Sequence, residues 1–329
     1  MKKKRILNKN VSNVKKSMMF ILCLLFCIHY SISMRAQTFA QMKSLAESGN
    51  VQAQFVLGNM YANGNGCLQD NQKAIYWYKK SIEGGNQRAL PSLAFVYDNL
   101  QDYDNAYPLF LSFASSDESK IGDYIDMLAI SRIKVGEYKL EGKGTSEDDV
   151  LAVTWLKKAL DIDWHGFAHT MLGYCYLKGE GVEKDSLIAF NNFKIATEQY
   201  NGEAGKIALA TCYVEGIGCP PDYAKVYSLL DNATDNKRST AQLLLGIAYY
   251  KDSSISDHYT KAVKWLQLSA NNTHKKNAAA AMYWLAKCYR FGRGVVKDIK
   301  KAEDLENIAA REGDEKALGL SRLLQRSQF

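Results

Sequence analysis

Proline, cysteine and histidine are all scarce in this sequence. Only 4 of the 329 residues are proline and 47% are apolar, which excludes a disordered chain and allows a sizeable core. The 7 cysteines are sparse for a chain of this length, which argues against a disulfide framework. The 5 histidines offer little material for a metal site or a catalytic base.

The first 36 residues differ in character from the rest. Seven lysines and arginines precede an unbroken apolar run over residues 18–28, and small and polar residues follow as far as Ala36. This layout is typical of a secretory signal peptide, because the run is shorter than the ~20 residues of a membrane span. We expect cleavage after Ala36. The alternatives are a cut near Ser33, an uncleaved signal anchor, or a lipid attached at Cys27.

Removal of this segment changes the charge and the cysteine count. It holds eight basic and no acidic residues, so the remainder has 34 basic and 35 acidic side chains and a net charge of −1. The overall charge of +7 therefore does not indicate a nucleic-acid partner. Five cysteines remain, an odd number, and none of the pairings is indicated by the sequence.

A block of about 37 residues recurs seven times. Its first copy combines Ala53, Leu57-Gly58 and Tyr61 with a Gly64-x-Gly66 loop, an aspartate, and a second apolar stripe beginning at Ala74. The slot that Tyr61 occupies recurs at positions 61, 97, 139, 176, 213, 249 and 289. The second copy lacks the glycine loop, the third has Lys139 in the tyrosine slot, and the sixth replaces the loop with polar residues.

Each part of this block predicts a helix or a turn. Apolar and small residues at i, i+4 and i+8 indicate one face of a first helix, and a similar stripe indicates a second. The first glycine suits a left-handed helix end, and the aspartate four residues after the second glycine suits an N-cap. Gly58 and its equivalents would let the two helices approach closely, with the tyrosine ring beside them. The fold class is therefore all-α.

This pattern resembles the Sel-one-like repeat, a relative of the tetratricopeptide repeat. The resemblance implies a right-handed α–α superhelix, an α-solenoid of about seven helix-turn-helix repeats with half-repeat caps. We expect a capping helix at 37–49, the array at 50–311, and a second capping helix at 312–329, because such arrays need polar ends. The second copy is more similar to a plain tetratricopeptide unit.

The patterns that enzymes require are incomplete in this sequence. His165 and His169 have the i, i+4 spacing of metal ligands, but no third ligand accompanies them at a convincing spacing. Ser131-x-x-Lys134 matches a fragment of the penicillin-recognising signature without its companion motifs. Cys175, Cys212 and Cys288 share one apolar slot, and we expect Cys67 and Cys219 to be more exposed. We predict no catalytic residue, metal or cofactor.

By analogy with tetratricopeptide proteins, the first helices would line a concave groove that binds a peptide. Tyr174, Ile247, Tyr250 and Tyr283 are the expected anchors, and Lys287 with Arg290 could hold a carboxylate. The full predicted set is Phe55, Asn59, Phe95, Glu137, Tyr174, Leu177, Ile247, Tyr250, Tyr283, Lys287 and Arg290.

The sequence thus favours a non-catalytic interaction scaffold or adaptor that binds a protein or peptide. The predicted signal places it in the periplasm or cell envelope, or elsewhere on the secretory pathway, with secretion or lipid anchoring as alternatives. We expect no transmembrane span in the mature chain. Two other functions stay open: a hydrolase similar to β-lactamases, which some cysteine-rich relatives of the repeat suggest, and a secreted factor that contacts a host.

Overall fold

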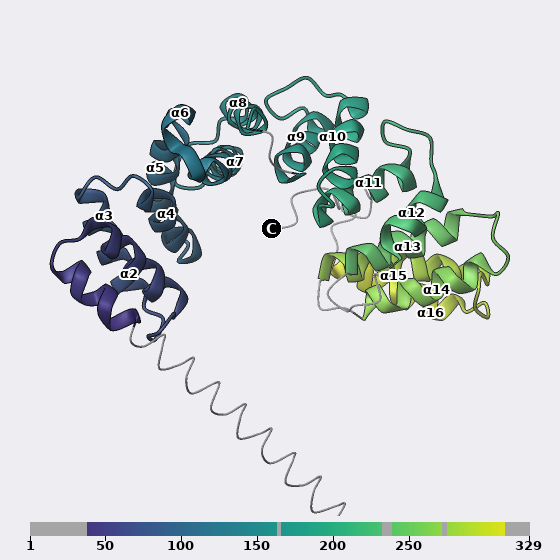
Figure 1. Ribbon diagram of the computed structural model, residues 1–329. Coiled ribbons are helices and arrows are strands. Elements are labelled where there is room, and N and C mark those ends of the chain that lie inside the picture. Colours follow the sequence, from purple (N-terminus) through teal and green to yellow (C-terminus); the bar gives the residue numbers. More distant parts are fainter. Residues whose placement is uncertain (1–37, 163–165, 232–238, 272–274, 313–329) are drawn as a thin grey trace, which may run out of the picture. The chain divides into compact units, whose positions relative to one another are not determined.

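The computed structural model describes residues 38–162, 166–231, 239–271 and 275–312 (Figure 1). All regular secondary structure within these ranges is helical, which confirms the predicted all-α class. The predicted signal peptide at 1–36 and nearly all of the predicted C-terminal capping helix at 312–329 lie outside them. The chain divides into two compact units, the first ending at Glu147 and the second beginning at Asp148.

The first unit begins with helical residues 38–47, in the place of the predicted N-terminal cap. Two antiparallel pairs follow, α2 with α3 and α4 with α5, and α7 packs on α5. The bounds are α2 (Val51–Asn63), α3 (Asn71–Glu83), α4 (Ala89–Asn99), α5 (Tyr103–Ala114), α6 (Glu118–Ile121), a 3-10 turn (Gly122–Tyr124) and α7 (Ile125–Glu141).

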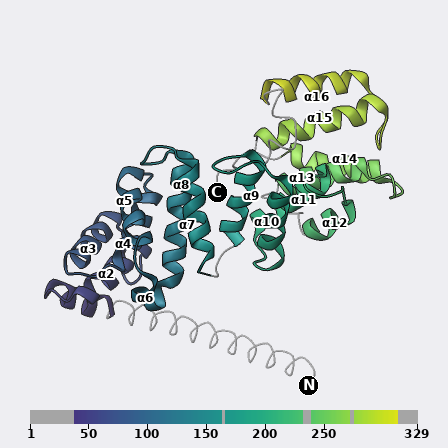
Figure 2. The ribbon, with the colours of Figure 1, turned by 90° about the horizontal axis from the view of Figure 1, so that it is seen from above.

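The second unit contains four successive helix pairs after α8, and each pair packs on the next (Figure 2). The bounds are α8 (Asp149–Leu160), α9 (Gly166–Lys178), α10 (Ser186–Glu198), α11 (Glu203–Glu215), α12 (Tyr223–Leu230), α13 (Ser239–Lys251), α14 (His258–Ala270), α15 (Lys275–Phe291) and α16 (Ile299–Glu312).

The repeated aspartates cap the second helices as predicted. Asp70 accepts a hydrogen bond from the backbone N–H of Lys73 at 3.0 Å, and Asp185 accepts one from Ile188 at 2.9 Å. The same bond forms at Asp148, Asp222 and Asp298. Each cap stabilises its helix by ~1 kcal/mol.

The two glycines of each loop have different roles. The first has the left-handed backbone of a helix end, with φ 80° at Gly179. The second also has positive φ, but it lies against the preceding repeat. A Cβ atom on Gly181 would stand 2.1 Å from the backbone oxygen of Asp149, and one on Gly218 would stand 2.1 Å from that of Ser186. The second glycine is therefore where successive repeats touch.

The close approach predicted at Gly58 and its equivalents is confirmed, but the tyrosine slot does not supply the ring that fills it. A Cβ atom on Gly58 would lie 2.6 Å from the ring of Tyr78, and one on Gly173 would lie 2.4 Å from the ring of Phe193. Both rings belong to the second helix of the same repeat and are buried. The apolar side chain that packs on the small residue thus comes from the facing helix.

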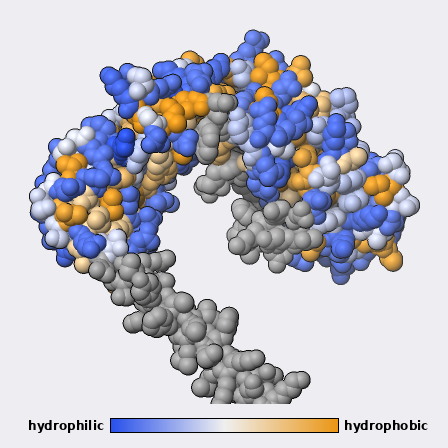
Figure 3. Space-filling view, viewed as in Figure 1, coloured by the Kyte–Doolittle hydropathy of each residue, from blue (hydrophilic) through white to orange (hydrophobic). Residues whose placement is uncertain are grey.

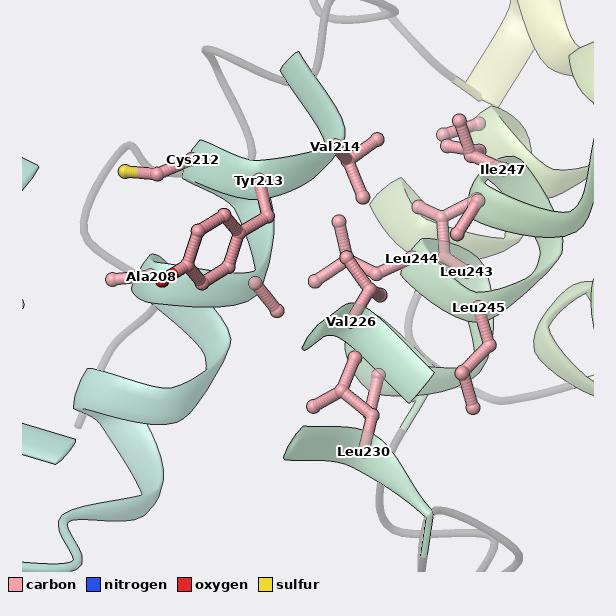
Figure 4. Close-up of a cluster of buried hydrophobic side chains, with 14 of the residues drawn as sticks. Ala208, Cys212, Tyr213, Val214, Val226, Leu230, Leu243, Leu244, Leu245 and Ile247 are labelled. Carbon is pink, nitrogen blue, oxygen red and sulfur yellow. The ribbon is translucent and has the colours of Figure 1, made fainter. Parts of the chain in front are cut away.

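A continuous apolar core runs through the second unit (Figure 4). It joins α11, α12 and α13, with Leu243, Leu244 and Ile247 fully buried. The residues shown around it include Ala208, Cys212, Val226 and Leu230. The burial of successive repeats in one core is what a stacked array requires, because a single helix pair cannot cover its own apolar face.

Candidate functional site

The predicted groove residues of the first unit mostly bond to other side chains of that unit. Phe55 is buried and contacts the Tyr78 ring at 6.1 Å between centroids. Asn59 accepts a hydrogen bond from the Tyr78 hydroxyl at 2.7 Å. The half-buried Phe95 packs edge-on against Phe110 at 5.0 Å. These three residues therefore stabilise the first unit, and Phe55 is not available to a ligand.

Glu137 belongs to a small charged network on α4 and α7. The Lys134 ammonium lies 3.1 Å from Glu137 and 3.1 Å from Asp98, and Asp98 also accepts a hydrogen bond from the Tyr138 hydroxyl. Burial disfavours the charged form of Lys134, but the two carboxylates outweigh burial and raise its pKa. The network leaves one uncompensated negative charge.

The fragment that resembles a penicillin-recognising signature is not assembled as a catalytic pair. The Ser131 side chain is fully buried and donates to the backbone oxygen of Met127 at 2.7 Å. Lys134 pairs with carboxylates instead. Both residues therefore have structural partners on α7 and its neighbours.

Two of the predicted anchors in the second unit are wrong. Ile247 is 0% exposed because it faces the core that α13 shares with its neighbours, and Tyr174 is 9% exposed beneath Phe193, whose ring lies 5.1 Å away. Burial also raises the pKa of Tyr174. Leu177 is half-buried and packs against the same core. The slot after the conserved glycine therefore points inward in these repeats.

Three more predicted residues, Tyr250, Tyr283 and Lys287, lie on α13 and α15. Three residues that were not predicted from the sequence lie with them: Tyr259, Trp284 and Arg293. Tyr250 packs on Trp284 at 5.1 Å and on Tyr259 at 5.4 Å, and Tyr283 packs on Trp284 at 6.1 Å. All these rings are half-exposed. We call the following set the aromatic–basic surface: Tyr250, Tyr259, Tyr283, Trp284, Lys287 and Arg293.

The two cations of this surface lie over its rings. The Lys287 ammonium is 4.5 Å from the Tyr283 centroid and 4.4 Å from that of Trp284. The Arg293 guanidinium is 5.2 Å from the Tyr250 centroid and 5.1 Å from that of Tyr259, and it donates to the Tyr250 hydroxyl. Neither cation has a carboxylate partner among the residues that the structure describes. Their positive charge is thus available to an incoming anion.

The predicted carboxylate-binding role of Arg290 needs correction. Its guanidinium already holds Glu306 of α16 through two hydrogen bonds, of 3.2 and 2.7 Å. This bidentate pair engages the N–H edge of the guanidinium formed by Nε and Nη2. Arg293, at the centre of the last Gly-x-Gly loop, takes its place beside Lys287.

The pKa of Tyr250, which lies between Tyr259 and Trp284, depends on its burial and on Arg293. Burial raises the pKa of Tyr250, while the Arg293 guanidinium lowers it to a smaller extent. The hydroxyl therefore stays protonated at neutral pH and can donate a hydrogen bond. Together the surface offers flat apolar rings, one hydroxyl and two cations, which suits a ligand that carries both apolar and acidic groups.

The histidines and cysteines of the described ranges form no assembled metal site. No group of three potential ligands occurs in the described ranges, which omit His165, and His169 bonds to Asn192 at 3.0 Å. Cys175, Cys212 and Cys288 are buried as predicted. Cys67 and Cys219 are more exposed than these three, as predicted, but they are still half-buried. Each thiol donates toward a backbone oxygen of the preceding helix, Met60 and Cys212 respectively.

The repeats match a known sequence family. The model of the Sel1 repeat matches residues 51–86, 129–162, 166–201, 205–229, 239–274 and 279–314. The chain belongs to the Sel1 repeat family. The unmatched stretch between 86 and 129 contains α4 and α5, the predicted second unit without a glycine loop. No curated protein matches this Sel1 repeat chain significantly.

Solved structures of other Sel1 repeat proteins are similar to this one. A protective antigen present in uropathogenic Escherichia coli strains, with an SLR fold, is 26% identical over 85% of this chain, with a TM-score of 0.52. The match spans 65% of that protein's length. A Sel1 repeat protein from Oxalobacter formigenes is 24% identical, with a TM-score of 0.58 over 88% of this chain and 83% of the other. The latter likeness shows the fold alone.

Proposed function

We propose that this Sel1 repeat protein is a non-catalytic scaffold that captures a peptide segment of a partner protein on the aromatic–basic surface. The observation that carries the proposal is the pair of cations, Lys287 and Arg293. Both lie over half-exposed rings, and neither has a carboxylate partner among the described residues. Sel1 repeat proteins generally mediate protein interactions, and this repeat array would hold such a surface rigidly.

The composition of the surface favours a peptide as its ligand. Tyrosine, tryptophan and arginine are the residues that dominate binding energy at protein interfaces. Rings such as Tyr283 and Trp284 give a large apolar contact at a low cost in side-chain entropy, and a nearby cation adds selectivity for acidic neighbours. The predicted anchors Tyr250 and Tyr283 keep their role in this proposal, while Tyr174 and Ile247 lose it.

The proposal is tested by crosslinking capture with residues 37–329 as bait, read by mass spectrometry. The test variant is Tyr283→Ala with Lys287→Ala, since both side chains are half-exposed on one turn of α15. The matched control is Lys264→Ala on α14, where the side chain is exposed. Proteins that the parent and control enrich and the test variant loses would identify the partner. Equal enrichment by all three baits would exclude the surface.

We further propose that the chain works outside the cytoplasm, in the periplasm or cell envelope. The basic and apolar layout of residues 1–36 supports export. None of the helices within the described ranges is long and apolar enough to cross a membrane. Fractionation of cells that express a C-terminally tagged chain tests this: a shortened chain in the envelope or periplasmic fraction supports export with cleavage near Ala36, and an uncleaved chain in the cytoplasm contradicts it.

One alternative function has a specific observation behind it. The similar E. coli protein is a protective antigen, so a role in contact with a host is the second candidate. Detection of the chain in the culture medium or on the cell surface would favour this role over a periplasmic one. A hydrolase similar to β-lactamases is less favoured because Ser131 and Lys134 have other partners. Turnover of β-lactam or ester substrates by the purified chain would support it.

A further inference from the structure

The loop between α15 and α16 differs from the other four glycine loops of the chain. Just before its first glycine stands Phe291, and the two residues before the capping aspartate are Val296 and Lys297. At the position of Phe291 the other loops have Asn63, Glu141, Lys178 and Glu215. At the positions of Val296 and Lys297 they have Leu68-Gln69, Ser146-Glu147, Glu183-Lys184 and Pro220-Pro221. Only the last loop combines an aromatic, an aliphatic and a basic residue.

The apolar side chains of this loop face solvent. Val296 is 88% exposed, Phe291 is 60% exposed, and Ile299 at the start of α16 is 41% exposed. Elsewhere the surface is mostly hydrophilic on the face that Figure 3 shows, with apolar residues in small groups. We call Phe291, Val296 and Ile299 the apolar tip. Their exposure in water is unfavourable unless something covers them.

Three exposed lysines lie next to the apolar tip in the sequence, in the loop and the first turn of α16: Lys297, Lys300 and Lys301. The acidic residue among them is Asp298. Asp298 is already engaged, since it accepts a hydrogen bond from the backbone N–H of Lys301 at the start of α16. Lys297 and Lys300 are exposed, and no ion pair to either occurs in the described part of the chain. This local positive charge contrasts with the net charge of −1 of residues 37–329 and favours an anionic partner.

We propose that the α15–α16 loop docks on an anionic phospholipid surface. Protruding apolar side chains surrounded by lysines fit the boundary between headgroups and acyl chains, where the apolar groups leave water and the ammonium groups meet phosphates. A peptide would need a groove to hold its backbone, whereas Val296 stands out from a loop. The Arg293 guanidinium of the aromatic–basic surface lies 5.2 Å from the Phe291 ring centroid, so the two surfaces touch there. The docking residues Val296, Lys297 and Lys300 are not part of the aromatic–basic surface, so the docking goes beyond the proposed scaffold function and is tested separately from it.

The proposal predicts a clear dependence on lipid charge and on this loop. Each lysine beside an anionic bilayer strengthens binding by roughly fivefold, so reversal of two lysines weakens it by well over ~25-fold. Dissolved salt screens the attraction between lysines and phosphates, and at 1 M the screening length is only ~3 Å. Binding should therefore decrease as salt is added. Loss of an inserted aliphatic side chain weakens binding by about tenfold.

The test is cosedimentation of residues 37–329 with vesicles of phosphatidylcholine containing about 30% phosphatidylglycerol, compared with pure phosphatidylcholine vesicles. The charge variant is Lys297→Glu with Lys300→Glu, and its control is Lys184→Glu with Lys264→Glu, which changes the net charge equally at other exposed positions. The apolar variant is Val296→Ser. Its control is Leu68→Ser, which alters the equivalent and equally exposed position of the first loop.

The proposal expects that the parent and both controls bind the anionic vesicles and that both loop variants lose binding. Three results would overturn it: no binding of the parent to anionic vesicles, equal binding to both kinds of vesicle, or unchanged binding of the loop variants. Binding of the loop to soluble polyglutamate with no vesicle binding would also overturn it, because an acidic polypeptide would then be the partner. Circular dichroism verifies that all variants keep the helix content of the parent.

Discussion

The contact between the second loop glycine and the preceding repeat gives the sharpest test of how this array holds together. We consider Gly181→Ala and, as a matched control in the same loop, Gly179→Ala. Both positions have positive φ, 68° and 80°. They differ in what a new Cβ atom would meet. At Gly179 it would lie 3.4 Å from the Lys184 side chain, an ordinary contact, but at Gly181 it would lie 2.1 Å from a backbone oxygen.

The expected losses of stability follow from this difference. An alanine in the left-handed region costs about 1–2 kcal/mol at either position. The overlap at Gly181 adds a second cost, because the Asp149 backbone cannot rotate away and the repeats must shift apart. Overpacking of this kind costs about 1–3 kcal/mol more. We therefore expect a loss of about 1–2 kcal/mol for Gly179→Ala and about 2–5 kcal/mol for Gly181→Ala.

The assay is urea unfolding of residues 37–329 followed by far-UV circular dichroism. Repeat arrays can unfold in steps, so the midpoint of the transition that both variants shift is the quantity to compare. We expect the shift for Gly181→Ala to be about twice that for Gly179→Ala. Equal shifts would refute the reasoning, because the conformational cost alone would then explain both changes and the contact with Asp149 would contribute nothing.

The remaining predictions concern single side chains. Tyr78→Phe should cost about 1 kcal/mol in urea unfolding, since it removes the hydrogen bond to Asn59; no change would mean that water replaces the bond. Arg290→Ala should leave partner capture unchanged, because Glu306 already occupies the Arg290 guanidinium. Arg293→Ala should abolish capture. The reverse result would mean that Arg290 binds the partner, as predicted from the sequence. Burial raises the pKa of Cys212 to about 12, so iodoacetamide at pH 8 should label it only after unfolding, as peptide mapping would show. The backbone N–H of Lys225 holds the pKa of Asp222 below its ordinary value of 3.8. This cap should therefore stabilise the fold fully above pH 4 and lose its effect as the pH falls through the lowered pKa. In acid unfolding, the stability of Asp222→Asn should depend less on pH over that range than the stability of the parent.

The sequence predicted the repeats well because their signals are local. The caps, the left-handed glycines and the close helix approach each depend on a few neighbouring residues whose spacing is visible in the chain. The second glycine was harder to interpret, since its partner Asp149 lies 32 residues earlier in the preceding repeat. A single repeat gives no indication of that contact.

The candidate site was less predictable because equivalent slots do not have equivalent surroundings. Ile247 and Lys287 occupy the same slot of successive repeats, yet Ile247 is fully buried in the core whereas Lys287 is half-exposed over the rings of Tyr283 and Trp284. Arg290 stands in a predicted groove position but pairs with Glu306, one helix later. Which cation stays unpaired depends on the side chains of the next helix, and the periodicity of the repeat carries no information about them.

The contacts of the second glycines also give the array a direction. Gly144, Gly181, Gly218 and Gly294 each lie against the start of a helix that precedes them in the chain. Each of these four loops therefore packs on a repeat that the ribosome has already made. A chain that lengthens from its N-terminus can form these contacts in order of synthesis, while the last repeat made keeps an uncovered apolar face until the next one packs on it.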